Sequence, residues 1–356
     1  MEKNTKRNRV IIGMVIFCLL YILFAFRPLS TELHLVPDWT VSINDLQSSN
    51  SSAVSNLIPF RLGQSIGYFT EDGKIASHIP YAFKAAISNK YYATFGADCE
   101  EADFFTSDGV KAGTIRVAGF PFFDEDRIYT FLPGGASFAS CAGDGSVEWS
   151  YESYAPIIAF DSSDGGTVAG FADGNVVSFN KDGKLDQKFA PGGSDFPVVL
   201  GVGISEDGET VACISGQNKQ RFVIAQKTDS IHSKIIFHEY LPDDTNNQVL
   251  VKFNRTGNSV YYNYNGGLGI VDLKKLKSSH VELDGKIIQI EESESDGMLC
   301  ILSKKNGTYT VTIVEPSDHP AAQFSFEADC AFIQVRGDAL YVGRNTTISR
   351  MTIERK

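Results

Sequence analysis

The sequence lacks several short motifs from which an active site or a metal centre is usually predicted. It contains no C-x-x-C pair, no H-x-H and no H-E-x-x-H. Its glycine-rich stretches, such as residues 133–135 and 265–267, are not followed by a helix that could hold a phosphate group. The sequence therefore predicts no catalytic residue, no cofactor and no metal ligand, and it predicts that the protein is not an enzyme.

Beyond residue 27, the chain has no excess of basic residues. The whole chain has a formal net charge of −11, whereas residues 1–27 carry five basic side chains against Glu2, or +4, so the remainder carries −15. An acidic domain of this kind repels phosphate backbones. Nucleic acid is therefore excluded as an expected partner.

Long apolar runs are limited to Val10–Phe26, seventeen residues without a charge. A helix of that length spans roughly 26 Å, which is near the lower limit for crossing a bilayer. A cleaved signal peptide has a similar pattern, but no small-x-small cleavage site follows the run. The excess of basic residues before the run places the N-terminus in the cytoplasm. The sequence thus predicts a cytoplasmic tail (1–9), an uncleaved anchor in the inner membrane (10–26) and a periplasmic domain.

Residues 27–63 are predicted to be a tether, because Ser42–Asn56 is rich in Ser and Asn. Four apolar residues near its start could lie on the membrane surface or dock on the following domain. They are Leu33, Leu35, Val36 and Trp39.

From residue 64 onward, runs of alternating apolar and polar residues are bounded by Asp-Gly and Asn-Gly turns, the pattern of β-strands. One family of turns recurs seven times, at spacings of about 36 to 50 residues. A second family precedes the last strand of each unit. It is clearest at Asp72-Gly73, Asp108-Gly109, Asp144-Gly145 and Asp182-Gly183. Two interleaved series indicate four strands in each unit, as in a propeller blade.

The fold class predicted for residues 64–356 is therefore all-β, a seven-bladed β-propeller with four-stranded blades. The units are 82–116, 119–151, 156–189, 198–239, 248–283, 286–327 and a last unit from Asp329. This last unit has only three strands, and the hairpin Ile66–Ile79 has no unit of its own. The hairpin is predicted to close the ring on the C-terminal blade, because an open sheet edge invites aggregation.

Three segments support a family resemblance, namely Asp144–Tyr151, Asp173–Asn180 and Asp182–Phe189. They resemble the repeats of PQQ-like (quinoprotein-dehydrogenase-like) and, more generally, WD40-like propellers. The chain lacks the regular tryptophans and the vicinal cysteines of the dehydrogenases. That group also contains non-enzymatic envelope proteins, such as the propeller lipoprotein of the outer-membrane assembly machinery. The resemblance therefore implies a membrane-anchored propeller of the non-enzymatic type.

Isolated residues could still form small sites. His232 and His238 flank one predicted strand and could share a face, although surface histidines are the simpler interpretation. Cys300 and Cys330 could meet between neighbouring blades and form a disulfide, although Cys300, like Cys213, is also explained as a small core residue inside an apolar strand. Acidic turns such as Asp161–Gly166 are read as hairpin turns rather than calcium loops.

The predicted function is a scaffold for protein–protein interaction in a cell-envelope assembly, because loops on a rigid frame are usual binding sites. The partners are envelope proteins of unspecified identity. Two alternatives remain: an enzyme or small-molecule sensor that uses the central channel, and a purely structural spacer. The loops expected to bind are Phe189–Pro197, Tyr240–Gln248 and Glu315–Ala322.

Overall fold

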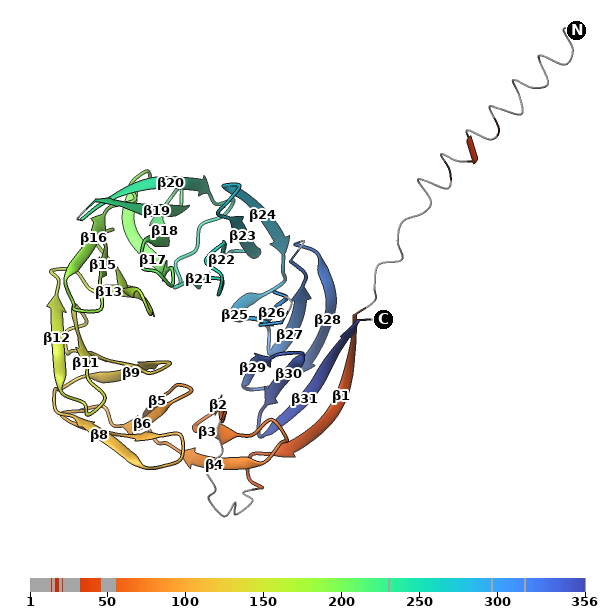
Figure 1. Cartoon of the computed structure of the whole chain (residues 1–356), viewed down its shortest axis with the longest axis horizontal. Helices are drawn as coiled ribbons and strands as arrows, with labels where there is room; N and C mark the ends of the chain where they lie inside the picture. Colours follow the sequence, from red (N-terminus) through yellow and green to blue (C-terminus); the bar gives the residue numbers. More distant parts are fainter. Residues whose placement is uncertain are drawn as a thin grey trace, which may run out of the picture.

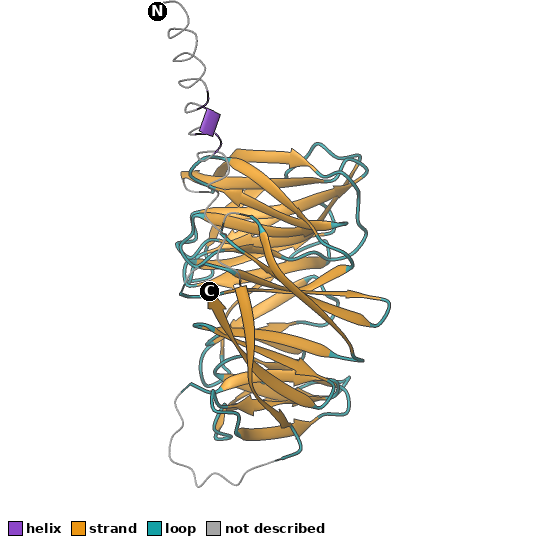
Figure 2. Ribbon diagram, turned by 90° about the vertical axis from the view of Figure 1, so that its right-hand side faces the viewer, coloured by secondary structure: helices purple, strands orange, loops and turns teal. Residues whose placement is uncertain are grey.

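The computed structural model describes residues 14, 17, 18, 21, 33–45, 56–229, 231–295, 297–316 and 318–355. These residues form eight antiparallel sheets that stand as blades around one ring (Figure 1). In the edge-on view, the ring consists of strands joined by short loops (Figure 2). The all-β propeller prediction is confirmed, but the predicted number of seven blades is wrong, because there are eight.

The first four blades follow chain order. Blade 1 contains β2 (Ile58–Leu62), β3 (Ser65–Phe69) and β4 (Ile75–Pro80). Blade 2 contains β5 (Lys84–Ile87), β6 (Tyr91–Phe95), β7 (Ala102–Thr106) and β8 (Lys111–Ile115). Blade 3 contains β9 (Phe120–Asp124), β10 (Arg127–Phe131), β11 (Ser137–Cys141) and β12 (Val147–Glu152). Blade 4 contains β13 (Ile157–Ser163), β14 (Gly166–Phe171), β15 (Val176–Phe179) and β16 (Leu185–Phe189).

The last four blades end with one that draws on both ends of the chain. Blade 5 contains β17 (Phe196–Ile204), β18 (Thr210–Gln217), β19 (Arg221–Asp229) and β20 (His232–Tyr240). Blade 6 contains β21 (Val251–Phe253), β22 (Ser259–Tyr264), β23 (Gly267–Asp272) and β24 (Lys277–Glu282). Blade 7 contains β25 (Lys286–Glu292), β26 (Leu299–Lys305), β27 (Thr308–Val314) and β28 (Pro320–Glu327). Blade 8 contains β29 (Ala331–Arg336), β30 (Ala339–Arg344), β31 (Thr347–Arg355) and β1 (Leu33–Ser42).

The ring has two different faces. In a four-stranded antiparallel blade, the turns from the first to the second strand and from the third to the fourth lie on the same side. We call that side the turn face. The links from the last strand of one blade to the first strand of the next lie on the opposite side, the connection face. The turn from the second to the third strand also lies on the connection face, and successive blades repeat this order around the ring.

The additional blade is built from the hairpin that was expected to close the ring. Ile66–Ile79 spans β3 and β4, which pair with β2 to form blade 1. The Asp72-Gly73 turn lies between β3 and β4, as Asp108-Gly109 lies between β7 and β8. The three strands of blade 1 thus correspond to the second, third and fourth strands of the other blades. Among the described residues, this blade has no counterpart of an innermost strand.

The ring is closed by β1, which comes from the segment predicted to be a tether. β1 pairs antiparallel with β31, from Leu33 opposite Arg355 to Ser42 opposite Thr347. The register shifts between Pro37 and Trp39, where proline cannot donate to the ladder. Figure 1 shows β1 on the outer side of β31. Of the four apolar residues expected either on the membrane surface or on the domain, Leu33, Leu35 and Trp39 pack on the domain, and Val41 packs there too.

The hydrophobic core is divided among the contacts between neighbouring blades. Each blade pair shares one cluster of buried side chains, and the smallest, around Ile66, Tyr81 and Ala85, joins blades 1 and 2. A blade therefore buries its faces only when both neighbours are present. This arrangement makes closure of the ring a requirement for stability.

The two tryptophans have the same structural role. A Cβ added at Gly183 would lie 2.3 Å from the Trp149 ring, and one added at Gly73 would lie 2.9 Å from the Trp39 ring. Each tryptophan of an outer strand thus packs on the Asp-Gly turn of the next blade. Both glycines have positive φ, 71° and 87°, which side-chain-bearing residues rarely adopt.

No helix among the described residues is long and apolar enough to cross a membrane. The fold-class prediction included one such helix at residues 10–26. From that range the structure describes Met14, Phe17, Cys18 and Tyr21, which are helical and exposed. The rest of the predicted anchor, and the predicted tail at residues 1–9, lie outside the described residues.

Candidate functional site

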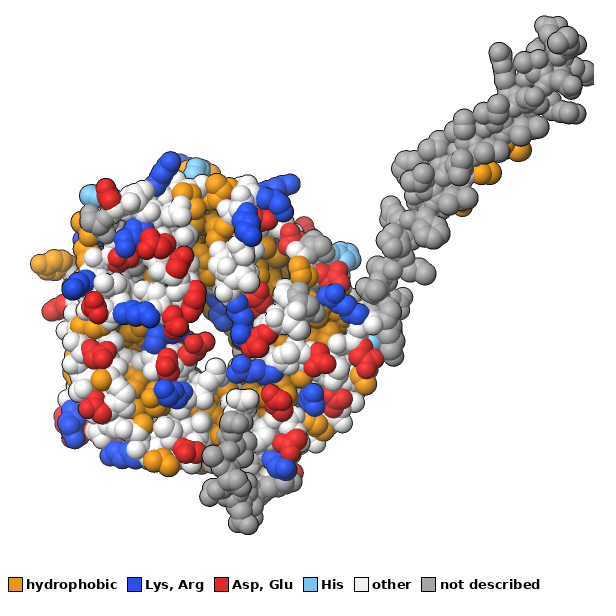
Figure 3. Space-filling model, viewed as in Figure 1, with side chains coloured by type: hydrophobic (Ala, Val, Ile, Leu, Met, Phe, Trp, Pro, Cys, Tyr) orange, Lys and Arg blue, Asp and Glu red, His pale blue; other side chains and the backbone are white. Residues whose placement is uncertain are grey.

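The candidate site is the central channel of the ring. Figure 3 shows that the molecule is open at its centre, with acidic and basic side chains around the opening. Within the channel lies a cavity of about 930 Å³, lined mainly by the innermost strands of blades 3 to 7, which are β9, β13, β17, β21 and β25. This volume is within the range of pockets that hold small ligands or inserted peptide side chains.

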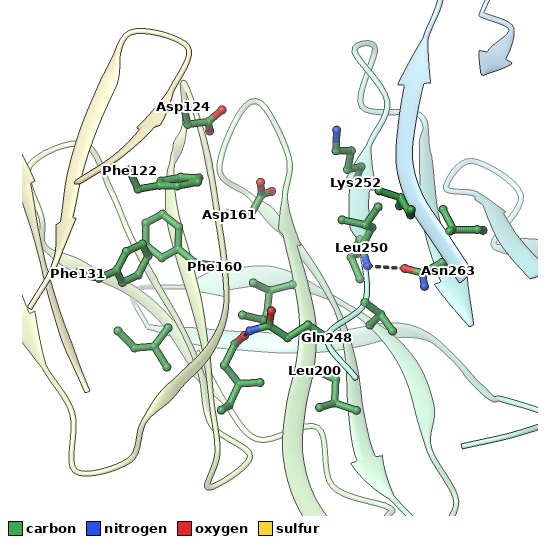
Figure 4. Close-up of a pocket in the computed structure, with 18 of the residues that line it drawn as sticks. Phe122, Asp124, Phe131, Phe160, Asp161, Leu200, Gln248, Leu250, Lys252 and Asn263 are labelled. Atoms are coloured by element: carbon green, nitrogen blue, oxygen red, sulfur yellow. Dashed lines mark hydrogen bonds between the residues drawn. The ribbon is translucent and has the colours of Figure 1, made fainter. Parts of the chain in front are cut away.

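Aromatic rings cover one wall of the cavity (Figure 4). The ring of Phe122 lies 6.0 Å from that of Phe131 and 5.7 Å from that of Phe160, and the rings of Phe131 and Phe160 are 5.0 Å apart. Alternation along β9 turns both Phe120 and Phe122 to the same side of the sheet. Aliphatic side chains, including Leu200 and Leu250, lie farther around the cavity. This part of the channel suits an apolar group.

Three charged side chains gather where the cavity approaches the turn face, and Lys286 lines its connection-face end. Asp124 and Asp161 lie on one side and Lys252 on the other (Figure 4). The backbone N–H of Ile204 donates to Asp161 at 3.0 Å. Burial raises the pKa of the Asp161 carboxyl to about 7, despite this hydrogen bond and the positive charge of Lys252. The Asp161 carboxyl therefore changes its protonation state near neutral pH.

Asp124 is held in a network of hydrogen bonds with Arg127. The guanidinium of Arg127 donates to Asp124 at 3.1 Å and to Asp164 of the next blade at 2.9 Å. The hydroxyl of Ser162 also donates to Asp124, at 2.5 Å. These contacts fix the carboxylate of Asp124 across the boundary between blades 3 and 4.

Carboxylates outnumber cations at the turn-face mouth of the channel. The mouth is lined by six carboxylate side chains and three cationic ones. The carboxylates belong to Asp124, Glu125, Asp161, Glu206, Glu291 and Glu292, and the cations to Arg127, Lys252 and Arg255. When all are ionised, the mouth carries a net charge of −3, which favours cations there.

Of the residues considered from the sequence, Asp161 of the acidic turn and Gln248 of the loop Tyr240–Gln248 line the cavity, whereas the histidines and cysteines form no site in the described part of the chain. His232 is exposed and contacts Asp229 at 3.0 Å, and no group of three potential ligands gathers around a metal position in the described part of the chain. Cys330 is a free thiol, so it forms no disulfide with Cys300. Phe189–Pro197 and Tyr240–Gln248 lie on the connection face, whereas Glu315–Ala322 belongs to the turn face.

One motif in the sequence was missed by the sequence analysis. Gly63–Gly67 matches G-x-S-x-G, the pattern of a hydrolase nucleophile turn, and the hydroxyl of Ser65 lies 3.0 Å from Nε2 of His78. That motif requires a turn from a strand into a helix, whereas Ser65 begins the second strand of the β2–β3 hairpin. Neither side chain lines the channel cavity. The pair is thus a cross-strand polar contact.

Exposed aromatic side chains mark the connection face. Among residues 33–355 that the structure describes, the exposed aromatics all lie on that face, whereas the exposed apolar residues of the turn face are aliphatic. The former are Phe83, Phe120, Phe122, Tyr154, Phe196 and Tyr240. The ammonium of Lys84 lies 4.6 Å from the centre of the Phe120 ring and 5.7 Å from that of Phe83. Phe95 adds a contact of 6.1 Å to Phe120. We call Phe83, Phe95, Phe120 and Phe122 the aromatic patch.

Known proteins are similar to this chain, one in sequence and two in fold. An uncharacterized protein of Treponema pallidum (strain Nichols) is 28% identical over 340 residues, which cover 92% of this chain and 89% of that protein. The crystal structure of BamB from Moraxella catarrhalis has a TM-score of 0.59 at 10% identity, covering 90% of this chain and 100% of BamB. The Dos1 propeller has a TM-score of 0.58 at 13% identity, with coverage of 89% and 95%.

At these identities, the two structures establish the fold alone. The family model described as "beta-propeller protein" matches residues 1–356, the full length of the sequence. The chain therefore belongs to the β-propeller protein family.

Proposed function

We propose that this propeller is an interaction scaffold of the cell envelope and that it binds a protein partner through the aromatic patch on its connection face. The observation that carries the proposal is the confinement of exposed aromatic side chains to that face in the described propeller. Aromatic residues dominate the binding energy of protein interfaces, and Phe120 and Phe122 are 36% and 38% exposed although both are strand residues.

The envelope setting and the extracytoplasmic location of the domain are part of the same proposal. They are supported by the basic residues that precede Val10–Phe26 and by the resemblance of Asp144–Phe189 to PQQ-like propellers, a group that includes envelope proteins. The absence of an enzymatic activity remains a prediction.

Photo-cross-linking in cells tests which face binds. A photoreactive residue at position 120 is expected to give a discrete adduct with an envelope protein, because this position lies within the patch. The same residue at Leu185 is the matched control, because Leu185 is 39% exposed but lies at a turn-face loop. Equal adducts at both positions, or none at position 120, would contradict the proposal.

A pair of substitutions tests the energetic contribution of the patch. We expect Phe120→Ser with Phe122→Ser to weaken binding of the cross-linked partner by at least about tenfold, because interface aromatics contribute about 1–4 kcal/mol each. The thermal midpoint should change by only a few degrees, because both rings are partly solvated already. Affinity measured with the purified partner, together with a thermal melt of the variant, checks both expectations.

A second candidate function is a small-molecule sensor. The cavity of about 930 Å³ favours it, because the aromatic wall and the charged groups converge on one part of the channel. A ligand retained in the purified protein and identified by native mass spectrometry would support this alternative.

A further inference from the structure

Phe122 links the aromatic patch to the channel. Phe122 belongs to the patch and also lines the cavity, where its ring contacts those of Phe131 and Phe160. A partner segment docked on the patch can therefore extend along Phe122 into the channel. At the far end of the aromatic wall it reaches the carboxyl groups of Asp124 and Asp161 (Figure 4).

Two of the three cationic side chains at the turn-face mouth already form ion pairs. Arg127 is bonded to Asp124 and Asp164, and Arg255 is paired with Glu294 at 2.7 Å. Lys252 donates to the backbone carbonyl of Ile290 at 3.3 Å and forms no ion pair with the described residues. The cationic side chains of the chain therefore do not neutralise the mouth.

Asp161 is the carboxyl group in the cavity that lacks a counter-ion. It accepts a hydrogen bond from the Ile204 backbone, and no ion pair joins it to another described residue. Burial is the first cause of its raised pKa, and the positive charge of Lys252 offsets it only in part, so an incoming cation would stabilise the ionised form. The net charge of −15 beyond residue 27 would also attract a basic partner over a longer range.

We propose that the channel receives a segment of the partner protein that is apolar and carries one Lys or Arg, whose cationic group lies between Asp161 and Asp124. The apolar part of the segment packs on Phe122, Phe131 and Phe160, and these rings also attract a cation that passes over their faces. This inference rests on the proposed scaffold function and adds the chemistry of the partner.

Binding of matched peptides to the full-length protein tests the inference. Three short capped peptides of Leu, Phe and Ser are compared, which differ only at a central position occupied by Lys, norleucine or Glu. At pH 8 and low salt we expect the Lys peptide to bind at least about tenfold more tightly than the other two, the difference typical of a close ionic pair. Fluorescence anisotropy of labelled peptides measures the affinities.

Removing the charge of Asp161 and removing that of Lys252 should change the binding of the Lys peptide in opposite directions. Asp161→Asn should lower the selectivity for the Lys peptide about tenfold, because the carboxylate that receives the cation is removed. Lys252→Gln should strengthen binding of the Lys peptide several-fold, because a repelling cation across the cavity is lost. An increase in affinity cannot result from misfolding, so Lys252→Gln separates the charge effect from a loss of structure.

Other results would overturn the inference. Preference for the Glu or norleucine peptide would do so, as would equal affinity of wild type and Asp161→Asn for the Lys peptide. Binding of 3-phenylpropylamine without binding of any peptide would also overturn it, because the channel would then hold a free amine. If cross-linking at position 120 still captures a partner in these cases, the scaffold function stands and only the channel inference fails.

Discussion

Deletion of Leu33–Ser42 from the full chain is expected to lower the thermal midpoint of the propeller by about 10 °C or more, or to prevent its folding. The deletion removes β1, which supplies the outer strand of blade 8, and with it the side chains of Leu33, Leu35, Trp39 and Val41. Partial burial of four apolar side chains contributes on the order of 4–6 kcal/mol. The deletion also leaves β31 as an unpaired edge that favours aggregation.

Differential scanning calorimetry and light scattering check this expectation. Two substitutions within β1 provide a matched comparison. Leu35→Asp should be strongly destabilising because Leu35 packs on the core between blades 7 and 8, whereas Thr40→Asp should change stability little because Thr40 is exposed. A synthetic peptide of the β1 sequence should restore part of the stability of the deleted chain by pairing with β31. An unchanged midpoint after deletion would show that β1 does not close the ring.

Asp161→Asn is expected to stabilise the protein at pH 8 and to have little effect at pH 4.5. Burial raises the pKa of Asp161 in the folded chain to about 7, whereas the unfolded chain has the ordinary value of 3.8. Between these values the folded state binds the proton more tightly, so stability falls as the pH rises through this window. Above pH 7 the full cost of the buried charge is present, and asparagine removes it. The gain at pH 8 is at most about 4 kcal/mol, and it is smaller to the extent that water enters the cavity.

Three neighbouring groups influence the ionisation of Asp161. The carboxyl of Asp124 on β9 faces it and opposes its ionisation, whereas Lys252 on β21 and the Ile204 N–H on β17 favour it. Denaturant unfolding of wild type and variant from pH 4.5 to 8 gives the difference in stability directly. Asp182→Asn, at an exposed turn, controls for the loss of one negative charge. A wild-type–variant difference that does not change with pH would contradict the prediction.

The place where the sequence failed to predict the fold is the junction of the two chain ends. β2 is short, and β1 lies in a segment whose following residues are rich in Ser and Asn, so neither was recognised as part of the propeller. The hairpin around Asp72-Gly73 was recognised but was assigned to the wrong blade. Thr40 and Ser349 share a hydrogen bond across 309 positions of the chain, a separation that local patterns cannot reveal.

The channel site likewise depends on distant parts of the chain. Asp124, Asp161 and Lys252 each occupy an inner strand near its turn-face end, but in three different blades. In the sequence each is an isolated charge among strand residues, and the turns beside two of them look like ordinary hairpins. Only the closed ring brings their side chains to one cavity and makes Asp161 a partly buried carboxyl without an ion-pair partner among the described residues.

The sequence by itself determined the repeating unit of this protein. Alternation within strands and the Asp-Gly turns between them act over a few residues, so they predicted β-blades directly. The count of charged residues gave the acidic net charge of the domain. The tertiary structure alone decided that there are eight blades, that β1 closes the ring and that aromatic and acidic side chains meet in the channel. The physical reason is that closure and cavity formation are set by how whole blades pack around an axis, and no local sequence pattern contains that geometry.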